Sequence, residues 1–420
     1  MTTAFTNISD LFQQAVQKEV KPWFEDNAPT YNALQKNVEI EEITEKGYRI
    51  PGMSERAGGH TAWLPSNSSF NAAKAPQSQS MYVFPVGYAL PIILQGTLIR
   101  ALNRRQGDAL INFQKLMEGY TKAATKRINQ MSWGDGSGCL AVSSSTLSST
   151  GAGQTMNCTT AAAATPGETK GAKRLEVNQY YQAINTSTGA VRGTILVTTA
   201  GSTSCVVNVI SGSVSSGDYI VDVGAYNRYM RGLAHLFNSS NRTLQGLNTA
   251  NNPDLNCSGL DLQRTLTPAD WETLKSLLHT RNNEDGAENM LSAFITYGQH
   301  SNLRKQGYGM RQYMGDDDTV RGVSKKFVDG DTTFHRDADG DEDCGYLIKN
   351  DQVKMFEEMP FGDYNLDGQE LRMLLGSNST GSDDYQKAIG CRSQMGILMP
   401  KSGTFFKRAS ITGVTTQATA

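Results

Sequence analysis

The sequence predicts an α+β protein in which elements from distant parts of the chain share sheets. Three observations lead to this fold class. Residues 108–131 repeat apolar side chains with helical spacing, residues 188–224 form short β-branched runs between Gly-Ser turns, and helical start signals return after residue 265. With 420 residues, the chain is long enough for two or three domains and a sizeable core.

Composition argues against several classes of protein. Apolar residues make up 38% of the chain and the mean hydropathy is −0.43, which is low for a compact enzyme of this length. Ser, Thr, Asn and Gly are abundant, which favours strands, loops and extended segments. Lys and Arg number 39 against 41 Asp and Glu, so the net charge of −2 offers no basic excess for tight phosphate contact. We therefore do not expect direct reading of a nucleic-acid sequence.

Targeting and cysteine signals indicate a soluble protein made and kept in a cytoplasm. The six cysteines are scattered, with no CxxC pair and no histidine at zinc-finger spacing, so free thiols are expected. The N-terminus has neither the basic nor the apolar region of a signal peptide. The longest apolar cluster, at 88–94, contains Pro91 and is too short to span a bilayer.

The first hundred residues predict an arm and a finger. Residues 5–20 form the pattern of a short amphipathic helix with no globular sequence beside it, so we expect it to dock elsewhere or on a neighbouring molecule. Its apolar side carries Phe5, Ile8, Phe12 and Val16. Residues 38–50 and 81–98 each predict a strand, and the intervening 51–80 have almost no apolar content. This pattern predicts a long two-stranded finger with an open tip.

The helix at 108–131 is the longest predicted element, at about 36 Å. Asp108 provides a start signal, because its carboxylate can accept the first-turn N–H groups. The apolar stripe consists of Leu110, Phe113, Met117, Tyr120, Ala124, Ile128 and Met131. The opposite face, which we expect to be wet or to lie against another polar surface, carries Asn112, Lys115, Lys122, Lys126 and Asn129. By itself the pattern also fits an ordinary amphipathic core helix.

The middle of the chain predicts a β-rich insert. A glycine-rich exit at 134–138 follows the long helix. Residues 141–167 are low-complexity Ser, Thr, Ala and Gly, and predict a flexible or loosely packed surface connection. The β-branched runs of 188–224 predict a small antiparallel sheet.

The remaining chain mixes helices and strands. Thr267 as N-cap, Pro268 at the first position and Asp270 in the first turn predict a helix start. The apolar face of this helix carries Trp271, Leu274, Leu277 and Leu278. Further predictions, in order, are a buried strand at 290–297, a polar helix at 299–306, a strand at 345–348, a helical turn at 353–356, and strands at 395–399 and 405–411.

Two acidic segments are the candidate cation sites. Asp363, Asn365 and Asp367, with glycine next, match the first half of an EF-hand loop, but position 12 is Leu374 and leaves the shell open. The acidic run 337–343 fails the same count. We expect both to be solvated acidic turns and predict no metal site and no cofactor.

Catalytic spacing is missing from the sequence. The histidines at 60, 235, 279, 300 and 335 are isolated, and no HExxH, GxSxG or GxxxxGK[ST] pattern occurs. We therefore do not expect an enzyme.

The order of the parts resembles the major capsid proteins of tailed bacteriophages, which have the Hong Kong 97-type fold. The local motifs that carry the resemblance are WGDGSG at 133–138, VSSGDYI at 214–220 followed by TLQGL at 243–247, and QMGILMP at 394–400. Two departures are that no domain of about a hundred residues precedes the arm, and that the insert at 170–225 is larger than the minimal fold requires. The first implies a separate scaffolding protein or assembly without one.

The resemblance also implies a division of the chain. Its parts would be an N-terminal arm (1–37), an extended loop (38–98), the spine helix of a peripheral domain (99–138), a low-complexity connection with the β-rich insert (139–225), an axial domain (226–335), and a return through the axial and peripheral domains to a C-terminal strand (336–420).

The implied function is that of a structural subunit. Such a subunit assembles with itself, as hexamers and pentamers, into an icosahedral head shell around double-stranded DNA that it contacts non-specifically. Scaffolding, portal and cement proteins would be its partners, and the virion, assembled in the bacterial host cytoplasm, its location, with no membrane involved. Two alternatives stay open: a calcium-dependent surface or adhesion protein, suggested by the Asp363 segment, the insert and the Ser/Thr tracts, and a hydrolase with an unfamiliar site.

Overall fold

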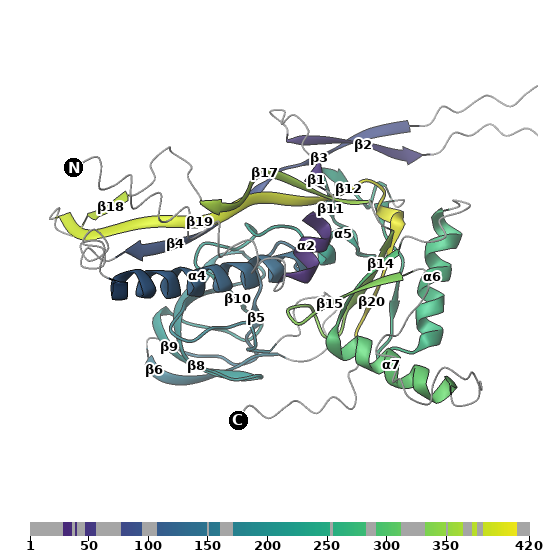
Figure 1. Cartoon of the computed structure of the whole chain (residues 1–420). Helices are drawn as coiled ribbons and strands as arrows, with labels where there is room; N and C mark the ends of the chain where they lie inside the picture. The colour runs from purple at the N-terminus through teal and green to yellow at the C-terminus, as the bar shows by residue number, and fades with distance from the viewer. Residues whose placement is uncertain are drawn as a thin grey trace, which may run out of the picture.

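Figure 1 shows a computed structural model of the protein, in which a long helix runs along a long sheet and a pair of strands projects from the body. The structure describes residues 28–35, 38–39, 47–55, 77–94, 107–148, 151–159, 171–252, 255–282, 291–311, 332–349, 352–363, 372–375 and 381–409. The arm predicted at 5–20, with its four apolar residues, lies outside this part of the chain, as do Asn365 and Asp367.

A mostly antiparallel sheet covers the long helix α4 (Gly107–Trp133). Its central strand β19 pairs with β4 along one edge and with β17 and β18 along the other, and the short β1 runs parallel to β17. The strands are β1 (Val38–Glu39), β4 (Val86–Leu94), β17 (Val353–Asp363), β18 (Arg372–Leu375) and β19 (Gly381–Ile397). Strands from both ends of the chain therefore share one sheet.

The side chains of α4 follow its 3.6-residue period. Phe113, Met117, Ala124, Ile128 and Met131 are buried in the main core, and Tyr120 is partly buried against it. Lys115, Lys122 and Lys126 are exposed on the opposite side. The described side chains do not include those of Leu110 and Asn112.

Asn129 departs from this division of the helix. It belongs to the polar side by spacing, yet it is fully buried. The sequence predicts that the polar face is either wet or lies against another polar surface. Asn129 lies against other polar groups and not against water.

The finger consists of β2 (Tyr48–Glu55) and β3 (Gln77–Val83), which form a two-stranded antiparallel sheet. Its base is anchored in the main core, because Tyr48, Ile50, Met81 and Val83 are all at most 3% exposed. A small hairpin of β11 (Thr243–Leu244) and β12 (Leu247–Asn248) lies beside this base.

Two predicted strands near the finger are each divided. The prediction of one strand at 38–50 is wrong, because β1 joins the large sheet whereas β2 belongs to the finger. The run 81–98 is likewise interrupted at Phe84 and Pro85, where β3 ends and β4 begins in a different sheet. Proline lacks the N–H that a continuous ladder needs, which makes this a suitable point for the change of sheet.

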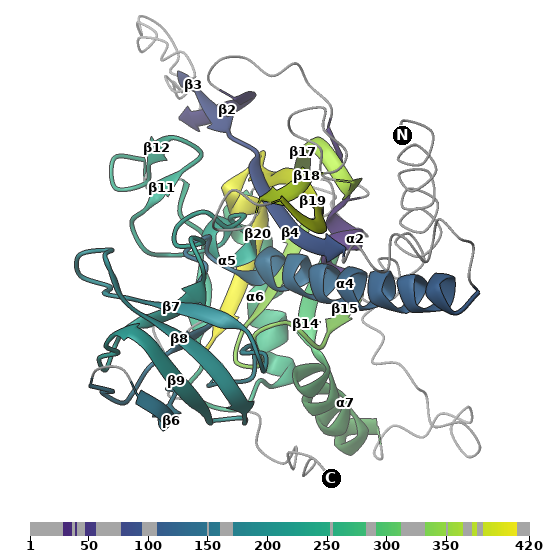
Figure 2. The same ribbon diagram turned by 90° about the vertical axis from the view of Figure 1, so that its left-hand side faces the viewer.

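The insert is a six-stranded antiparallel sheet with a core of its own, in the order β5-β10-β7-β8-β9-β6. Its strands are β5 (Ala141–Val142), β6 (Gly151–Asn157), β7 (Tyr180–Ile184), β8 (Val191–Ala200), β9 (Ser204–Gly212) and β10 (Tyr219–Asp222). Figures 1 and 2 both place the insert and the finger on opposite sides of α4 and its sheet.

The prediction of a loose connection at 141–167 is wrong for its described residues. β5 and β6 are paired members of the insert sheet, and Leu147 and Met156 are buried in its core. Ladder hydrogen bonds come from the backbone, so a strand of small polar residues can pair when a neighbouring strand supplies the apolar contacts.

The third part is a mixed sheet in the order β13-β20-β16-β14-β15, packed against two helices around a separate core. Its strands are β13 (Gly259–Asp261), β14 (Leu291–Thr296), β15 (Thr332–Asp337), β16 (Gly345–Lys349) and β20 (Gly403–Lys407). The helices are α6 (Pro268–Asn282) and α7 (Tyr297–Arg311), and the short helices of the chain include α2 (Pro29–Gln35), α5 (Leu233–Leu236) and η2 (Pro400–Ser402).

The start of α6 has the predicted capping arrangement. The Thr267 hydroxyl accepts a hydrogen bond from the backbone N–H of Asp270 at 3.3 Å, and the Asp270 carboxylate accepts one from the N–H of Thr267 at 3.0 Å. Trp271, Leu274 and Leu278 are buried, whereas Leu277 is only partly so.

The helical turn predicted at 353–356 is wrong. These residues begin β17, where Val353 pairs with Ile397 and Met355 with Met395. The four-residue pattern is too short to decide between helix and strand, and the pairing with β19 decides it.

Candidate functional site

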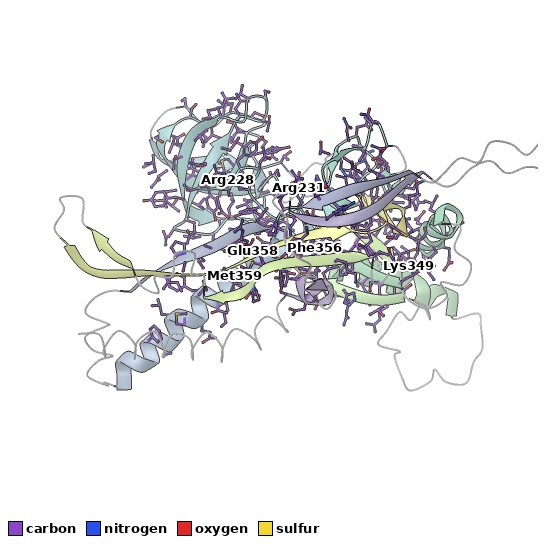
Figure 3. All side chains as sticks on the ribbon, turned by 90° about the horizontal axis from the view of Figure 1, so that it is seen from above. Arg228, Arg231, Lys349, Phe356, Glu358 and Met359 are labelled. Carbon is purple, nitrogen blue, oxygen red and sulfur yellow. The ribbon has the colours of Figure 1, made fainter. Side chains whose placement is uncertain are left out.

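The base of the finger is fixed to the large sheet by ring packing and a hydrogen bond. The ring centroids of Tyr48 and Phe356 are 5.2 Å apart, and the Tyr48 hydroxyl donates to the carbonyl oxygen of Glu357 at 3.3 Å. Seen from above, Phe356 and Glu358 lie along the strand that passes beneath the finger (Figure 3). The finger is therefore rigidly attached at its base, while its two strands pair only with each other among the described strands.

The C-terminal end of α4 meets a buried polar cluster, the Asp337 junction, formed by Thr30, Asn129, Trp133 and Asp337. The Thr30 hydroxyl donates to Asp337 Oδ2 at 2.6 Å, and Trp133 Nε1 donates to the same oxygen at 3.0 Å. Asn129 Nδ2 donates to both oxygens, at 3.0 Å to Oδ1 and 2.8 Å to Oδ2. One carboxylate thus holds α2, α4 and the end of β15 together.

The acidic turn after β15 is not the solvated turn that the sequence predicts. Asp337 is 1% exposed and Asp341 is fully buried. Asp337 is satisfied by the junction, and Asp341 forms an ion pair with the buried Arg174 of the insert, with 3.4 Å between Oδ1 and Nη2. Burial of these acids requires partners of this kind, and the partners come from distant parts of the sequence.

Four ion pairs connect the insert region to the long helix and to the acidic turn. They are Arg127–Asp222, Lys126–Glu176, Arg174–Asp341 and Lys173–Glu342. The Arg127–Asp222 pair is the better buried of the two that involve α4, and the Tyr229 hydroxyl also donates to Asp222. Because the insert has its own core, these charges orient it on the body and contribute little to its folding.

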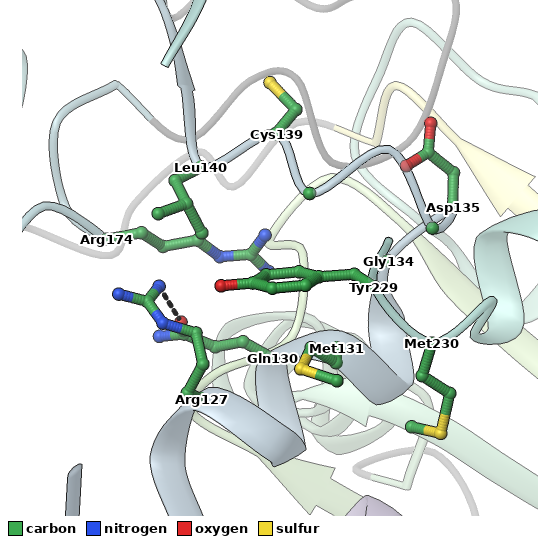
Figure 4. Close-up of a pocket in the computed structure, with 12 residues that line it drawn as sticks. Arg127, Gln130, Met131, Gly134, Asp135, Cys139, Leu140, Arg174, Tyr229 and Met230 are labelled. Carbon is green, nitrogen blue, oxygen red and sulfur yellow. Dashed lines mark hydrogen bonds between the residues drawn. The ribbon is translucent and has the colours of Figure 1, made fainter. Parts of the chain in front are cut away.

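A small hollow lies where the insert meets the end of α4 (Figure 4). It is lined by Arg127, Arg174, Tyr229, Cys139 and the glycine-rich exit, and has a volume of about 20 Å³. Burial lowers the pKa of Arg174 to about 10, and the charge of Arg127 acts in the same direction, so Arg174 stays charged at neutral pH. This volume suits a single water molecule and is far too small for a substrate or cofactor.

The structure brings no candidate cation site together in the described part of the chain. Asp363 is the last residue of β17 and pairs with Ile389. No group of three or more His, Cys, Asp or Glu side chains among the described residues is arranged to hold a metal ion. None of the described helices is both long and apolar enough to cross a membrane. Each of the six cysteines is a free thiol, and Cys139 alone of the six is not buried.

Asp339, next to the junction, gives a pH-dependent prediction. Burial raises the pKa of its carboxyl, and the charge of Asp337 acts in the same direction. A carboxyl whose pKa is raised on folding stabilises the protein below its unfolded pKa, and this contribution is lost as the pH rises through the folded pKa. Asp339→Asn is therefore expected to raise the melting temperature at pH 7 by a few degrees.

The gain should shrink towards zero as the pH falls to about 4, where the unfolded carboxyl also takes up its proton. Thermal unfolding followed by circular dichroism between pH 4 and 8 measures it. Glu342→Gln is the control, because this side chain lies on the same turn and is 57% exposed, and its ion pair with the likewise exposed Lys173 contributes little to stability. A melting temperature that is lower for Asp339→Asn at every pH would contradict the prediction.

Several solved structures, phage capsids among them, are similar to this chain over most of its length. In the cyanophage A-1(L) capsid asymmetric unit, the identity is 9%, the TM-score is 0.49, and 91% of this chain and 93% of that chain are covered. For Mycobacterium phage Patience the identity is 9%, the TM-score 0.43, and the coverage 96% and 88%. For the capsid of a native GTA particle the identity is 8% and the TM-score is 0.42, and 91% of this chain and 91% of that chain are covered. No family model and no curated protein matches the chain.

Sequence reasoning missed the Asp337 junction and the buried Arg174–Asp341 pair. The one local signal is an asparagine next to the stripe of a long helix, together with an acidic run that fails as a cation loop. The bonds of Asp337 to Thr30, Asn129 and Trp133 join residues 204 or more positions apart in the chain, so no local pattern links them.

Proposed function

We propose that the protein is the structural subunit of the icosahedral head shell of a tailed bacteriophage, which encloses the double-stranded DNA genome. The finger is the observation that carries this proposal. An isolated two-stranded hairpin is marginally stable in water, so the strands beyond the buried base need a surface to lie on. A neighbouring copy supplies that surface in a closed shell, where symmetry repeats the contact for every subunit.

The long helix and its attachments would give a shell subunit a rigid frame. The long helix lies along the sheet from which the finger rises, and the Asp337 junction ties its end to the third part of the molecule. In this role α4 is the strut, its apolar stripe is the packing face, and residues 38–98 form the extended loop that overlaps the next subunit. The insert lies on the other side of α4, where it is free to face away from the finger contact.

The remaining assignments follow the family resemblance of the sequence. Phe5, Ile8, Phe12 and Val16 of the arm would tie subunits together around hexamers and pentamers. Residues 226–335 would form the axial domain, and 336–420 would return through the peripheral domain to the C-terminal strand. Scaffolding, portal and cement proteins would be partners during assembly in the host cytoplasm. The net charge of −2 fits non-specific contact with packaged DNA that small cations neutralise. Catalysis and a cofactor have no part in this role.

Shortening the finger tests the proposal. In the variant, a two-residue Asn-Gly turn replaces residues 51–80, which keeps Tyr48, Ile50, Met81 and Val83 in the core. Wild-type protein, alone or co-expressed with its genomic neighbours, is expected to form shells, tubes or rings in negative-stain microscopy and to sediment accordingly. The variant is expected to sediment as a single subunit.

The melting temperature of the shortened variant is the control. It should lie within a few degrees of the wild-type value, because the removed segment lies beyond the buried base. Particles purified from phage-infected cells should also protect double-stranded DNA from nuclease. A wild-type protein that stays monomeric under every condition would overturn the proposal. A shortened variant that still forms closed shells would overturn the role given to the finger in assembly.

A further inference from the structure

The edge of β19 continues past the point where β4 leaves it. β4 pairs with β19 from Leu94 opposite Tyr385 to Val86 opposite Ser393, whereas β19 runs on to Ile397. Before Val86 the chain turns away through Phe84 and Pro85 into the finger. The last residues of β19 therefore have β17 on one side and no strand of the large sheet on the other among the described residues.

Gln245 occupies this vacated edge. With its amide oriented so that both of its polar atoms are satisfied, the side-chain oxygen accepts from the backbone N–H of Ile397 at 2.6 Å. The side-chain nitrogen donates to the carbonyl oxygen of the same residue at 3.0 Å. A side-chain amide bonded to both polar groups of one backbone residue replaces the ladder contact that a neighbouring strand would make.

The backbone of Gln245 holds the finger at the same time. Its carbonyl oxygen accepts a hydrogen bond from the backbone N–H of Tyr82, in β3, at 2.9 Å. Gln245 is only 6% exposed, so water competes weakly for these bonds. One residue thus bonds to the end of the large sheet and to the first part of the finger.

Gln245 is itself fixed in place by the β11–β12 hairpin. It has a φ of +49° and Gly246 has a φ of +87°, the two positive values of a type I′ turn. Leu244 beside it is fully buried in the main core. At Gly396 a Cβ would lie 2.8 Å from the end of the Gln245 side chain and 2.9 Å from Val83, so glycine there leaves room for both the Gln245 amide and the finger.

We propose that Gln245 is a positioning residue that sets the direction in which the finger leaves the body. The Tyr48 ring and its hydrogen bond to Glu357 attach the base of the finger at β2. The bonds of Gln245 add a second, directional attachment at β3, and two such points fix an angle. Only Phe84 and Pro85 separate β3 from β4, and β4 is paired to β19, so the position of β4 on β19 restricts where β3 can begin. This role concerns the single subunit and does not depend on the proposed assembly.

The test compares two glycine variants, Gln245→Gly and Gln263→Gly. Gln263 has the same φ of +49° but is exposed, so both substitutions relieve the same backbone strain, while only the first removes the side-chain amide that bonds to Ile397. Hydrogen–deuterium exchange is measured by mass spectrometry on the unassembled full-length chain. Gln245→Gly is expected to speed exchange of the amides of 80–83 and 394–397 by about tenfold, with the insert unchanged.

Gln245→Glu gives a second readout that keeps the size of the side chain. Its carboxylate cannot donate to the Ile397 carbonyl, so exchange should rise in the same two segments. Exchange at the wild-type rate in both Gln245 variants would overturn the proposal. So would faster exchange spread evenly over all three cores, or an equal effect of Gln263→Gly. Because the subunit is measured before assembly, failure here is separate from failure of the shell proposal.

Discussion

Replacing Asp337 by alanine is expected to lower the free energy of unfolding by about 3–5 kcal/mol. The carboxylate accepts hydrogen bonds from Thr30, Asn129 and Trp133, each of which is fully buried. Removing the acceptor leaves the buried Thr30 hydroxyl without its acceptor. Trp133 Nε1 then keeps only Thr30 Oγ1 as an acceptor, and Asn129 Nδ2 keeps only Asp339 Oδ2. An unsatisfied buried donor costs more than the net value of the bond it loses, so the effect exceeds that of deleting a comparable surface acid.

Denaturant unfolding measures this loss, and two further observations identify its origin. Glu342→Ala is the matched control on the same turn, with a side chain 57% exposed, and should change stability by less than about 0.5 kcal/mol. In Asp337→Ala, protection from hydrogen exchange should fall first in α2, because Thr30 of that helix loses its bond to Asp337. A loss below about 1 kcal/mol would mean that the junction contributes little.

Local patterns predicted the elements whose signals are complete within a few turns of chain. The stripe of the long helix is such a case, since Phe113, Met117 and Ile128 recur with helical spacing and are all buried. The start of α6 is another, because a capping arrangement needs only Thr267 and Asp270. The β-branched runs of the insert likewise fold as antiparallel strands. In each case the residues that decide the structure are neighbours in sequence.

The predictions that fail depend on contacts between distant residues. The turn expected at 353–356 is a strand because β19, some forty residues later, pairs with it. The acidic turn is buried because Arg174 and Asn129 approach it from two other parts of the molecule. The low-complexity residues of β6 are ordered by pairing with β9, to which their own composition gives no clue. The composition of a segment indicates how much apolar surface the segment can bury by itself. It does not indicate how much apolar surface a neighbouring strand supplies.

The segment 223–232, which leads from the insert to α5, approaches the end of α4, and this contact gives the second large effect. Gly232 donates from its backbone N–H to the carbonyl of Gly134 at 3.0 Å and precedes the short helix α5. A Cβ at this position would lie 2.3 Å from the Ser132 carbonyl oxygen and 2.5 Å from that of Met131. Both are backbone atoms of the last helical turn, so they cannot rotate away as a flexible side chain can.

Gly232→Ala is therefore expected to destabilise the protein by at least about 3 kcal/mol, at the upper end of overpacking effects, because the loop and the helix must separate. Equilibrium unfolding of the variant measures the loss. Gly119→Ala, in the middle of α4, is the matched control. Gly119 is exposed and a Cβ there meets nothing within 4 Å, so alanine should stabilise the protein by about 0.5–1 kcal/mol. If Gly232→Ala lowers and Gly119→Ala raises the free energy of unfolding, the loss in Gly232→Ala comes from the contact between segment 223–232 and the end of α4. Equal effects at the two positions would show that this contact yields without strain.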